Sequence, residues 1–171
     1  VSYTILGKAE RMCLDKGKAD ISTLDSFRGI GLLQHKYKLL EWGLMSCMWR
    51  NLMRAMDEEV LGFLPSRSGC QALWRVRAET DYRIRQGKPW VWLSMDVKKA
   101  FDTIMREVGL AAAEGLGADK QWLDNWGKLW EGLEAQLRFA GHRGGKVKWQ
   151  RGVVQGGQTS PGHYAIASLY F

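Results

Sequence analysis

The sequence predicts an α/β domain that is rich in helices, and three observations support this fold class. Apolar residues recur every three to four positions over 32–56, which predicts an amphipathic helix. From about Asp119 the same spacing predicts a second helix, whose apolar stripe reaches Leu137. Residues 90–96 form a short, nearly continuous apolar run of aromatic and branched side chains, which predicts a buried strand.

The remaining segments are consistent with the same fold class. Ser68 is a candidate N-cap for a helix over 69–86, which Gly87 and Pro89 would end. The charges at i,i+4 spacing in this helix are explained by a solvated face. The other expected elements are short strands and loops in 1–31, a helix over 103–114, a strand or hairpin over 146–154 and a helix from Ser160-Pro161 onward.

Length and composition indicate one globular domain spanning residues 1–171. Of these residues 46% are apolar and 25% are charged, which excludes a disordered or collagen-like chain. No apolar run approaches the roughly 18 residues of a membrane-spanning helix, so we expect no membrane partner. The chain lacks an initiator Met and stops at Phe171 within an apolar stretch, so we expect a fragment of a longer protein.

The chain is basic, with 25 Lys and Arg against 18 Asp and Glu, a net charge of +7 and a pI near 9.5. Such a domain attracts polyanions, and composition alone does not choose between nucleic acid and an anionic membrane surface. The cations cluster in 67–88 and in 138–151, and the second segment contains no acid. Its cations are Arg138, Arg143, Lys146, Lys148 and Arg151.

Cysteine and histidine usage argues against a zinc site. Cys13, Cys47 and Cys70 are widely spaced and form no CxxC pattern, and no HxxxH or HExxH pattern occurs. Three unpaired thiols are typical of a reducing, intracellular compartment.

The carboxylate of Asp96, which ends the predicted strand, is the first candidate functional group. Burial of this charge is costly unless it is paired or holds a cation. Asp96 could cap the following segment, or it could coordinate Mg²⁺, which prefers carboxylate oxygens together with substrate phosphates. The residues alone leave both alternatives open.

A glycine-rich motif, RGVVQGGQTSP at 151–161, is the second candidate. Its glycines permit close approach of the backbone to a ligand. Gln155 could hydrogen-bond a base or a sugar, and Arg151 could contact a phosphate. The alternative is a glycine-rich hairpin that leads into a capped helix, since the motif matches neither dinucleotide-binding nor Walker patterns.

Four ordered blocks of the sequence together resemble reverse transcriptases. They are DSFRGIGLLQHKYKLLEWGL, LPSRSGCQAL, DVKKAFDTI and RGVVQGGQTSP. They are similar to the fingers segment, the Arg-Ser/Gly segment, the first palm motif and the motif that follows it. The resemblance covers residues 8–171 and is nearest to the non-LTR retrotransposon or group II intron type. It implies fingers over about 1–89 and a partial palm over about 90–171 of a right-hand polymerase, without later palm strands or thumb.

The resemblance assigns roles to residues of the palm. Asp96 matches the catalytic, metal-binding aspartate, and the backbone of Val97 lies at the same metal site beside the triphosphate. Phe101 matches the aromatic gate that excludes a 2′-hydroxyl, whereas Asp102 is a local structural acceptor. Gln155 and Gly156 match the pair that lines the nucleotide pocket.

The resemblance also implies contacts with phosphates. Arg28 matches the fingers arginine on the incoming triphosphate, and Lys18 is given a similar role. The basic segments, both helix 69–86 and the turn at 138–151, are candidates for the nucleic-acid track, although solubility explains the helix equally well. The nucleic-acid-binding residues we name are Arg143, Lys146, Lys148 and Arg151.

The implied reaction is DNA synthesis on a DNA primer along an RNA template, from deoxynucleoside triphosphates and with two Mg²⁺ ions. The family's aromatic-Ala-Asp-Asp hairpin does not occur in the 171 residues, so we expect this chain to be inactive by itself. The resemblance implies a nuclear location for a eukaryotic retrotransposon and a cytoplasmic one for a bacterial element. It does not indicate an oligomeric state.

Two other functions compete with this interpretation. One is a non-catalytic nucleic-acid-binding remnant of a retroelement. The other is an RNA-templated RNA polymerase, against which Phe101 argues because a bulky gate selects deoxynucleotides.

Overall fold

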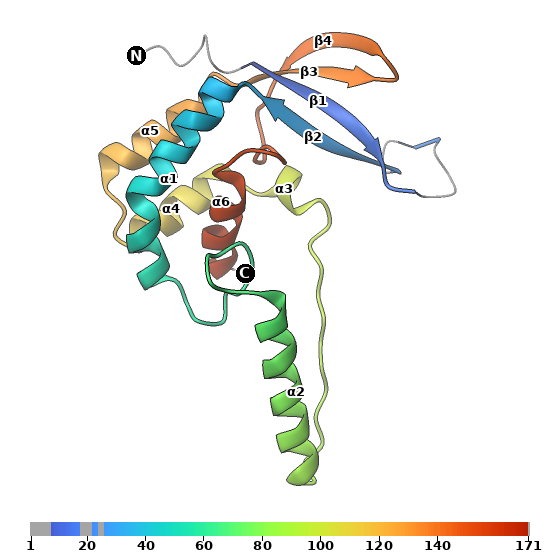
Figure 1. Ribbon diagram of the computed structural model, residues 1–171, viewed down its shortest axis with the longest axis vertical. Helices are drawn as coiled ribbons and strands as arrows, with labels where there is room; N and C mark the ends of the chain where they lie inside the picture. The colour runs from blue at the N-terminus through green and yellow to red at the C-terminus, as the bar shows by residue number, and fades with distance from the viewer. Residues whose placement is uncertain (1–7, 18–21, 24–25, 171) are drawn as a thin grey trace.

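The computed structural model describes residues 8–17, 22–23 and 26–170, which form a mixed α/β structure (Figure 1). Within these ranges a four-stranded sheet lies over one end of a helical bundle made of α1, α4, α5 and α6, while α2 projects away as an arm. The expected helix-rich α/β class is confirmed. No helix in the described part of the chain has the length and apolarity that crossing a bilayer demands. The helices are α1 (His35–Ala55), α2 (Gly69–Arg85), α3 (Ala100–Thr103), α4 (Arg106–Gly115), α5 (Lys120–Glu131), α6 (Ser160–Ala167) and the 3₁₀ helix η3 (Ser168–Tyr170).

The sheet has the strand order β2-β1-β3-β4. Strands β1 (Lys8–Asp15) and β2 (Phe27–Leu33) pair antiparallel, and β3 (Glu134–Phe139) pairs parallel to β1 and antiparallel to β4 (His142–Lys148). The register aligns Ala9 with Leu33 on one side and with Ala135 on the other. Because side chains alternate along a strand, these three apolar residues share the face that packs on the bundle.

Three tryptophans of α5 form the centre of the bundle. Trp122, Trp126 and Trp130 are spaced four residues apart and are all buried, so they belong to the core as their spacing predicts. The helix ends at Glu131 with Gly132 as its C-cap, and Leu137 lies in β3, where it is 42% exposed. The prediction of one helix that reaches Leu137 is therefore wrong, because Gly132 ends the helix first.

The predicted boundaries of the other helices are mostly confirmed. Helix α2 begins at Gly69 after a capping box, in which Gln71 Oε1 accepts the Ser68 backbone N–H at 2.9 Å. The helix expected over 103–114 corresponds to α4, which begins at Arg106, and the short helix α3 precedes it. Between them the extended backbone of Ile104 inserts this side chain into the core, where it is 4% exposed.

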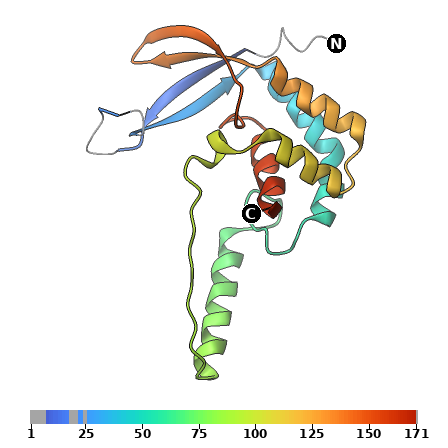
Figure 2. The ribbon, with the colours of Figure 1, turned by 180° about the vertical axis from the view of Figure 1, so that it is seen from behind.

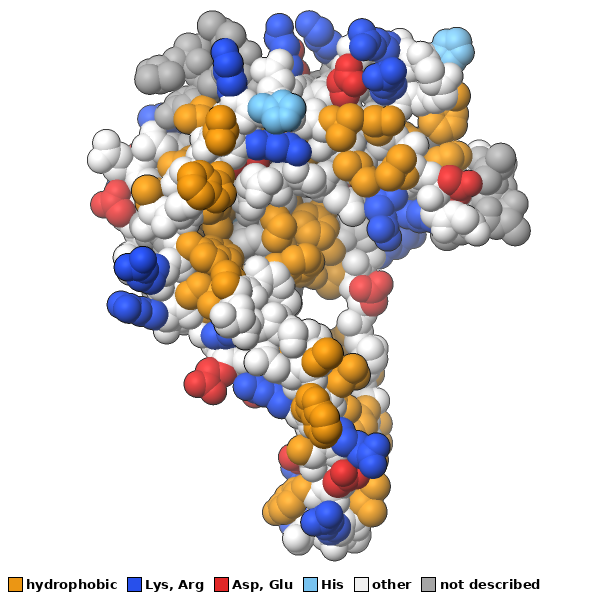
Figure 3. Space-filling view, in the orientation of Figure 1, with side chains coloured by type: hydrophobic (Ala, Val, Ile, Leu, Met, Phe, Trp, Pro, Cys, Tyr) orange, Lys and Arg blue, Asp and Glu red, His pale blue; other side chains and the backbone are white. Residues whose placement is uncertain are grey.

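The strand expected over 90–96 does not form. These residues have no regular secondary structure and are exposed, with Val91 at 91% and Met95 at 83%. The segment runs back along α2, which itself buries no residue, and the Trp92 indole donates to Thr80 Oγ1 at 3.0 Å (Figure 2). A strand needs the backbone of a neighbour for its hydrogen bonds, and the described residues offer none to this segment. Apolar side chains therefore gather along the surface of the arm (Figure 3).

His163 of α6 is a fully buried imidazole in the helical core. Its ring lies edge-on against Trp126 and Trp130, with ring centroids at 5.2 and 4.7 Å. A Cβ added at Gly109 of α4 would collide with this ring, so the glycine makes room for it. Burial lowers the pKa of His163 to about 4, and a backbone interaction with Met105 only partly opposes this shift.

We expect His163 to make the stability of the protein depend on pH. Between the ordinary pKa of 6.5 and the folded-state pKa of about 4, the unfolded chain binds a proton that the folded chain does not. The stabilising contribution is complete above the ordinary value and is lost as the pH falls toward the folded value, by about 3 kcal/mol.

The check is urea unfolding of the wild type and of His163→Leu across this pH range. The difference in unfolding free energy, wild type minus variant, should decrease as the pH falls. The pKa of Glu41 is raised by burial and acts with the opposite sign, but Glu41 is present in both proteins and cancels. If the difference in unfolding free energy between the two proteins does not vary with pH, the pKa of His163 is not lowered in the folded protein.

Candidate functional site

The glycine-rich segment, residues 149–159, joins three parts of the structure that are far apart in the sequence. We call this segment the glycine loop. Val153 donates its backbone N–H to the carbonyl of Phe101 in α3 at 2.8 Å. Gly31 of β2 donates its N–H to the carbonyl of Gln155, also at 2.8 Å. Helix α3, strand β2 and the glycine loop are therefore in direct contact.

Arg106, the first residue of α4, holds the beginning of the glycine loop. Its Nε donates to the Gly152 carbonyl at 2.6 Å and its Nη2 to the Trp149 carbonyl at 2.9 Å. Burial lowers the pKa of the guanidinium, which lies 5.6 Å from the centroid of the Trp130 ring. Gly152 has a φ of +73°, and a Cβ there would lie 2.5 Å from the Phe101 carbonyl, so no other residue fits.

Glu41 of α1 holds the other end of the glycine loop. The side chain is 1% exposed, and its Oε2 accepts the backbone N–H of Gln158 at 2.9 Å. Its Oε1 accepts the Thr159 hydroxyl at 2.7 Å. The loop thus runs between a half-buried cation and a buried acid.

Phe101 belongs to a cluster of three aromatic rings beside the glycine loop. Its ring stacks on Tyr164 of α6 at 5.4 Å and meets the edge of Phe63 at 5.9 Å. Phe63 itself is 55% exposed, so the cluster reaches the surface. The cluster fixes the orientation of the Phe101 ring.

One comparison with known proteins identifies the family of this chain. A sequence model of the family described as reverse transcriptase (RNA-dependent DNA polymerase) matches residues 15–169, which is nearly the whole chain. The chain belongs to the reverse transcriptase family. The match includes α3 and the glycine loop, so the contacts described above are contacts within a reverse transcriptase domain.

The two acids of the first palm-like motif, Asp96 and Asp102, lie in different surroundings. Asp96 lies on the exposed segment next to α2, and Val97 is 44% exposed. The carboxylate of Asp102 is engaged by Arg11 at 2.6 Å, which agrees with its predicted role as a structural acceptor. In 8–17, 22–23 and 26–170 no three His, Cys, Asp or Glu side chains are grouped to hold a metal ion. Because Mg²⁺ can be bound by one or two carboxylates together with substrate phosphates, the metal role of Asp96 and Val97 stays a prediction.

Two residues, Arg28 and Lys18, are predicted to contact the triphosphate, and only Arg28 lies in the described part of the chain. Lys18 lies outside the described residues. Arg28 is an exposed residue of β2. On the same strand, a Cβ added at Gly29 would meet Arg11, and one added at Gly31 would meet Val154, so these two positions face the bundle side of the sheet. Since side chains alternate along a strand, Arg28 projects from the opposite face, and its predicted contact with triphosphate stays a prediction.

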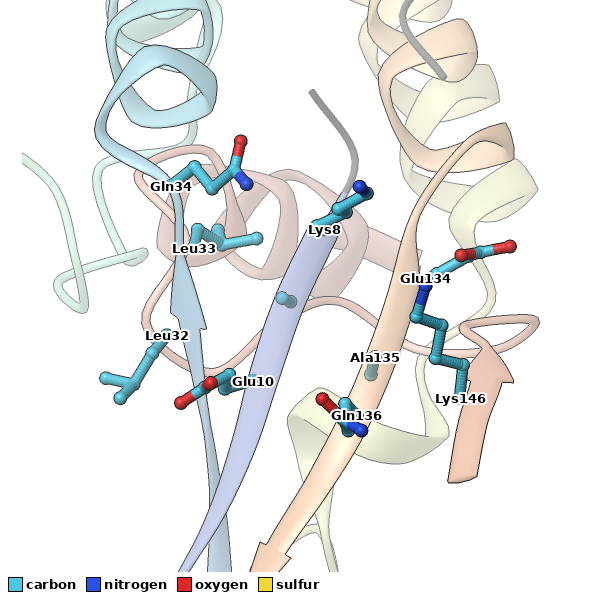
Figure 4. Close-up of a pocket in the computed structure, with 10 residues that line it drawn as sticks. Lys8, Glu10, Leu32, Leu33, Gln34, Glu134, Ala135, Gln136 and Lys146 are labelled. Atoms are coloured by element: carbon cyan, nitrogen blue, oxygen red, sulfur yellow. The ribbon is translucent and has the colours of Figure 1, made fainter. Parts of the chain in front are cut away.

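Four cations of the 138–151 segment, Arg143, Lys146, Lys148 and Arg151, are exposed on and next to the β3–β4 hairpin, whereas Arg138 is half-buried. Arg143 pairs with Glu10 at 3.3 Å, and Arg151 Nε donates to the Thr103 carbonyl at 3.4 Å. Lys146 lines a hollow of about 370 Å³ on the sheet, together with Lys8, Glu10, Gln34, Glu134 and Gln136 (Figure 4). Lys148 and Arg151 line a second hollow of about 270 Å³, which Arg11 and Trp149 share.

Sequence reasoning missed three charged residues that shape this site. Glu41 stands four residues from both Tyr37 and Met45, which are buried, so its position on the core face was a signal available in the sequence. Arg106 and Arg11 gave no such signal, because their partners come from distant segments.

We expect Arg106→Met to destabilise the protein by about 2 kcal/mol, because two buried carbonyls lose their donor. Hydrogen exchange at the Val153 amide should increase selectively, since the loop start is no longer held. The control is Arg50→Met, which removes an exposed arginine of α1. Equal effects of the two substitutions in chemical unfolding and hydrogen exchange would contradict the role of Arg106.

Proposed function

We propose that this chain forms the nucleotide- and template-binding part of an RNA-directed DNA polymerase of the non-LTR retrotransposon or group II intron type. One observation carries the proposal. The segments that the resemblance assigns to the nucleotide pocket, around Phe101 and around Gln155–Gly156, are joined by the backbone hydrogen bond from Val153 to Phe101 although about fifty residues separate them. A packed loop of this kind supplies a pre-ordered surface for a ligand.

In this function each group has a defined task. The ring of Phe101 excludes a ribose 2′-hydroxyl by its bulk, and its contacts with Tyr164 and Phe63 keep it in place. The half-buried Gln155 and the exposed Gly156 present an amide and bare backbone to the nucleotide. The exposed hairpin cations bind template phosphates without regard to sequence.

Reverse transcriptases use Mg²⁺, which neutralises charge on the reacting phosphates. Such chemistry needs carboxylates besides Asp96, and the 171 residues contain no Asp-Asp pair. We therefore propose that this chain binds primer–template and nucleotide but does not extend a primer by itself. The exposed position of Asp96 favours one second candidate, a nucleic-acid-binding remnant without catalysis.

We expect the chain to bind an RNA–DNA primer–template through the hairpin. The double substitution K146A/K148A should weaken binding about tenfold at low salt and lower the slope of log K against log[salt] by about two. The matched control is R77A/R83A in α2, which removes the same charge from cations that pair with Asp81 and Glu79. Fluorescence anisotropy measures the affinity of each double variant for the primer–template and its salt dependence. A larger loss of affinity in the control than in K146A/K148A would contradict the assignment of binding to the hairpin.

We also expect template-directed nucleotide binding without chemistry. On a chain-terminated primer, the complementary deoxynucleotide should stabilise the protein–nucleic acid complex about tenfold more than a mismatched one. Phe101→Ala should let the complementary ribonucleotide bind as well as the deoxynucleotide. The wild type should give no primer extension with Mg²⁺.

The outcomes separate the two candidates. Duplex binding without any preference for the complementary nucleotide indicates the non-catalytic remnant. Clear primer extension by the isolated chain refutes the proposal that it is inactive.

A further inference from the structure

The buried carboxylate of Glu41 is engaged entirely by the glycine loop. One oxygen accepts a backbone N–H and the other accepts a hydroxyl, and the two donors are the neighbouring residues Gln158 and Thr159. Thr159 is fully buried, so its hydroxyl has no access to solvent. A buried charge of this kind is tolerated only where hydrogen bonds replace its water. The contact is therefore a specific one between α1 and the loop.

The space around the carboxylate is matched to the loop. A Cβ at Gly157 would lie 3.1 Å from Glu41 Oε1 and 2.8 Å from Ser160 Oγ, so a larger residue would crowd the carboxylate and the Ser160 hydroxyl. Gly157 also donates its backbone N–H to the Val154 carbonyl at 2.9 Å. Residues 154–157 therefore form a tight turn, and Glu41 packs against it at Gly157.

The same turn is also bound to strand β2 of the sheet, at Gln155 and Gly156. Besides the hydrogen bond from Gly31 to the Gln155 carbonyl, a Cβ at Gly156 would lie 2.6 Å from the Gly31 carbonyl. Gly156 has a φ of +115°, which favours glycine. Gln155 and Gly156 are therefore held between two anchors, β2 on one side and Glu41 on the other.

We propose that Glu41 is a positioning residue for the nucleotide pocket, which sets the placement of Gln155 and Gly156 through Gln158 and Thr159 without touching the nucleotide. This inference rests on the proposed function of the same loop. It assigns a polymerase role to a helix residue that lies more than a hundred positions before the loop in the sequence.

The hydrogen-bond geometry predicts which substitution is tolerated. A glutamine at position 41 can accept the Gln158 N–H with its carbonyl oxygen and donate its amide to Thr159 Oγ1. It also carries no charge, and burial raises the pKa of the Glu41 carboxyl, so the site already disfavours the charged form. An alanine can make neither contact.

The test compares Glu41→Gln and Glu41→Ala in the full 171-residue chain. The control is Leu123→Ala, a buried position of α5 that destabilises the core away from the loop. Two measurements are made on each protein: hydrogen exchange of residues 155–159, and the affinity of the complementary deoxynucleotide for the complex with a chain-terminated primer–template.

We expect E41A to speed exchange across 155–159 and to weaken nucleotide binding about tenfold, while primer–template affinity changes less than about twofold. E41Q should restore both properties to near wild-type values. L123A should lower global stability without a selective effect on the loop. If E41A does not fold, Thr159→Val, which removes only the hydroxyl donor, should still speed exchange of the loop.

The inference is overturned if the wild type binds the complementary nucleotide and E41A binds it equally well, or if E41Q behaves like E41A. If the wild type itself shows no preference for the complementary nucleotide, the proposed function fails and the positioning role fails with it. In that case hydrogen exchange still reports whether Glu41 orders the loop, so the two failures are distinguishable.

Discussion

The structure depends on how the glycine loop is held between the sheet and the helical bundle. Val153 and Val154 bury the middle of the loop in the core, whereas its two ends are held by the half-buried Arg106 and the buried Glu41. Arg106 donates to carbonyls at the beginning and Glu41 accepts from donors at the end. Each charge loses its water on folding and is compensated by loop hydrogen bonds, so the loop and the two charged groups stabilise one another.

This constraint connects the two apolar cores of the protein. One core lies between the sheet and α1 and contains Ala9, Leu33 and Ala135, and the other contains the α5 tryptophans and α6. The glycine loop crosses from the first core to the second, because Val154 packs with the sheet and Val153 packs with the helices. A change in the conformation of the loop therefore alters packing in both cores.

The arm stands outside this arrangement. Helix α2 buries no residue, and the segment that carries Asp96 is joined to α2 by the hydrogen bond from Trp92 to Thr80. The groups proposed to bind nucleotide therefore belong to a packed body, whereas the acid predicted to bind metal belongs to an exposed segment. The predicted metal ligand Asp96 thus has no regular secondary structure around it, whereas the glycine loop is held by hydrogen bonds at both ends.

The sequence by itself determined the family, the helices α1 and α2, the α5 tryptophan core and the start of a helix at Ser160-Pro161. Each of these follows from local spacing or from motif order, which the chain carries without its fold. Only the tertiary structure decided that 90–96 remains without a partner strand and that Ile104 separates α3 from α4. It also decided that Glu41 and Arg106 bind the glycine loop and that Arg11 pairs with Asp102. Those outcomes depend on which backbone groups lie opposite each other across long stretches of sequence, and periodicity does not record such pairings.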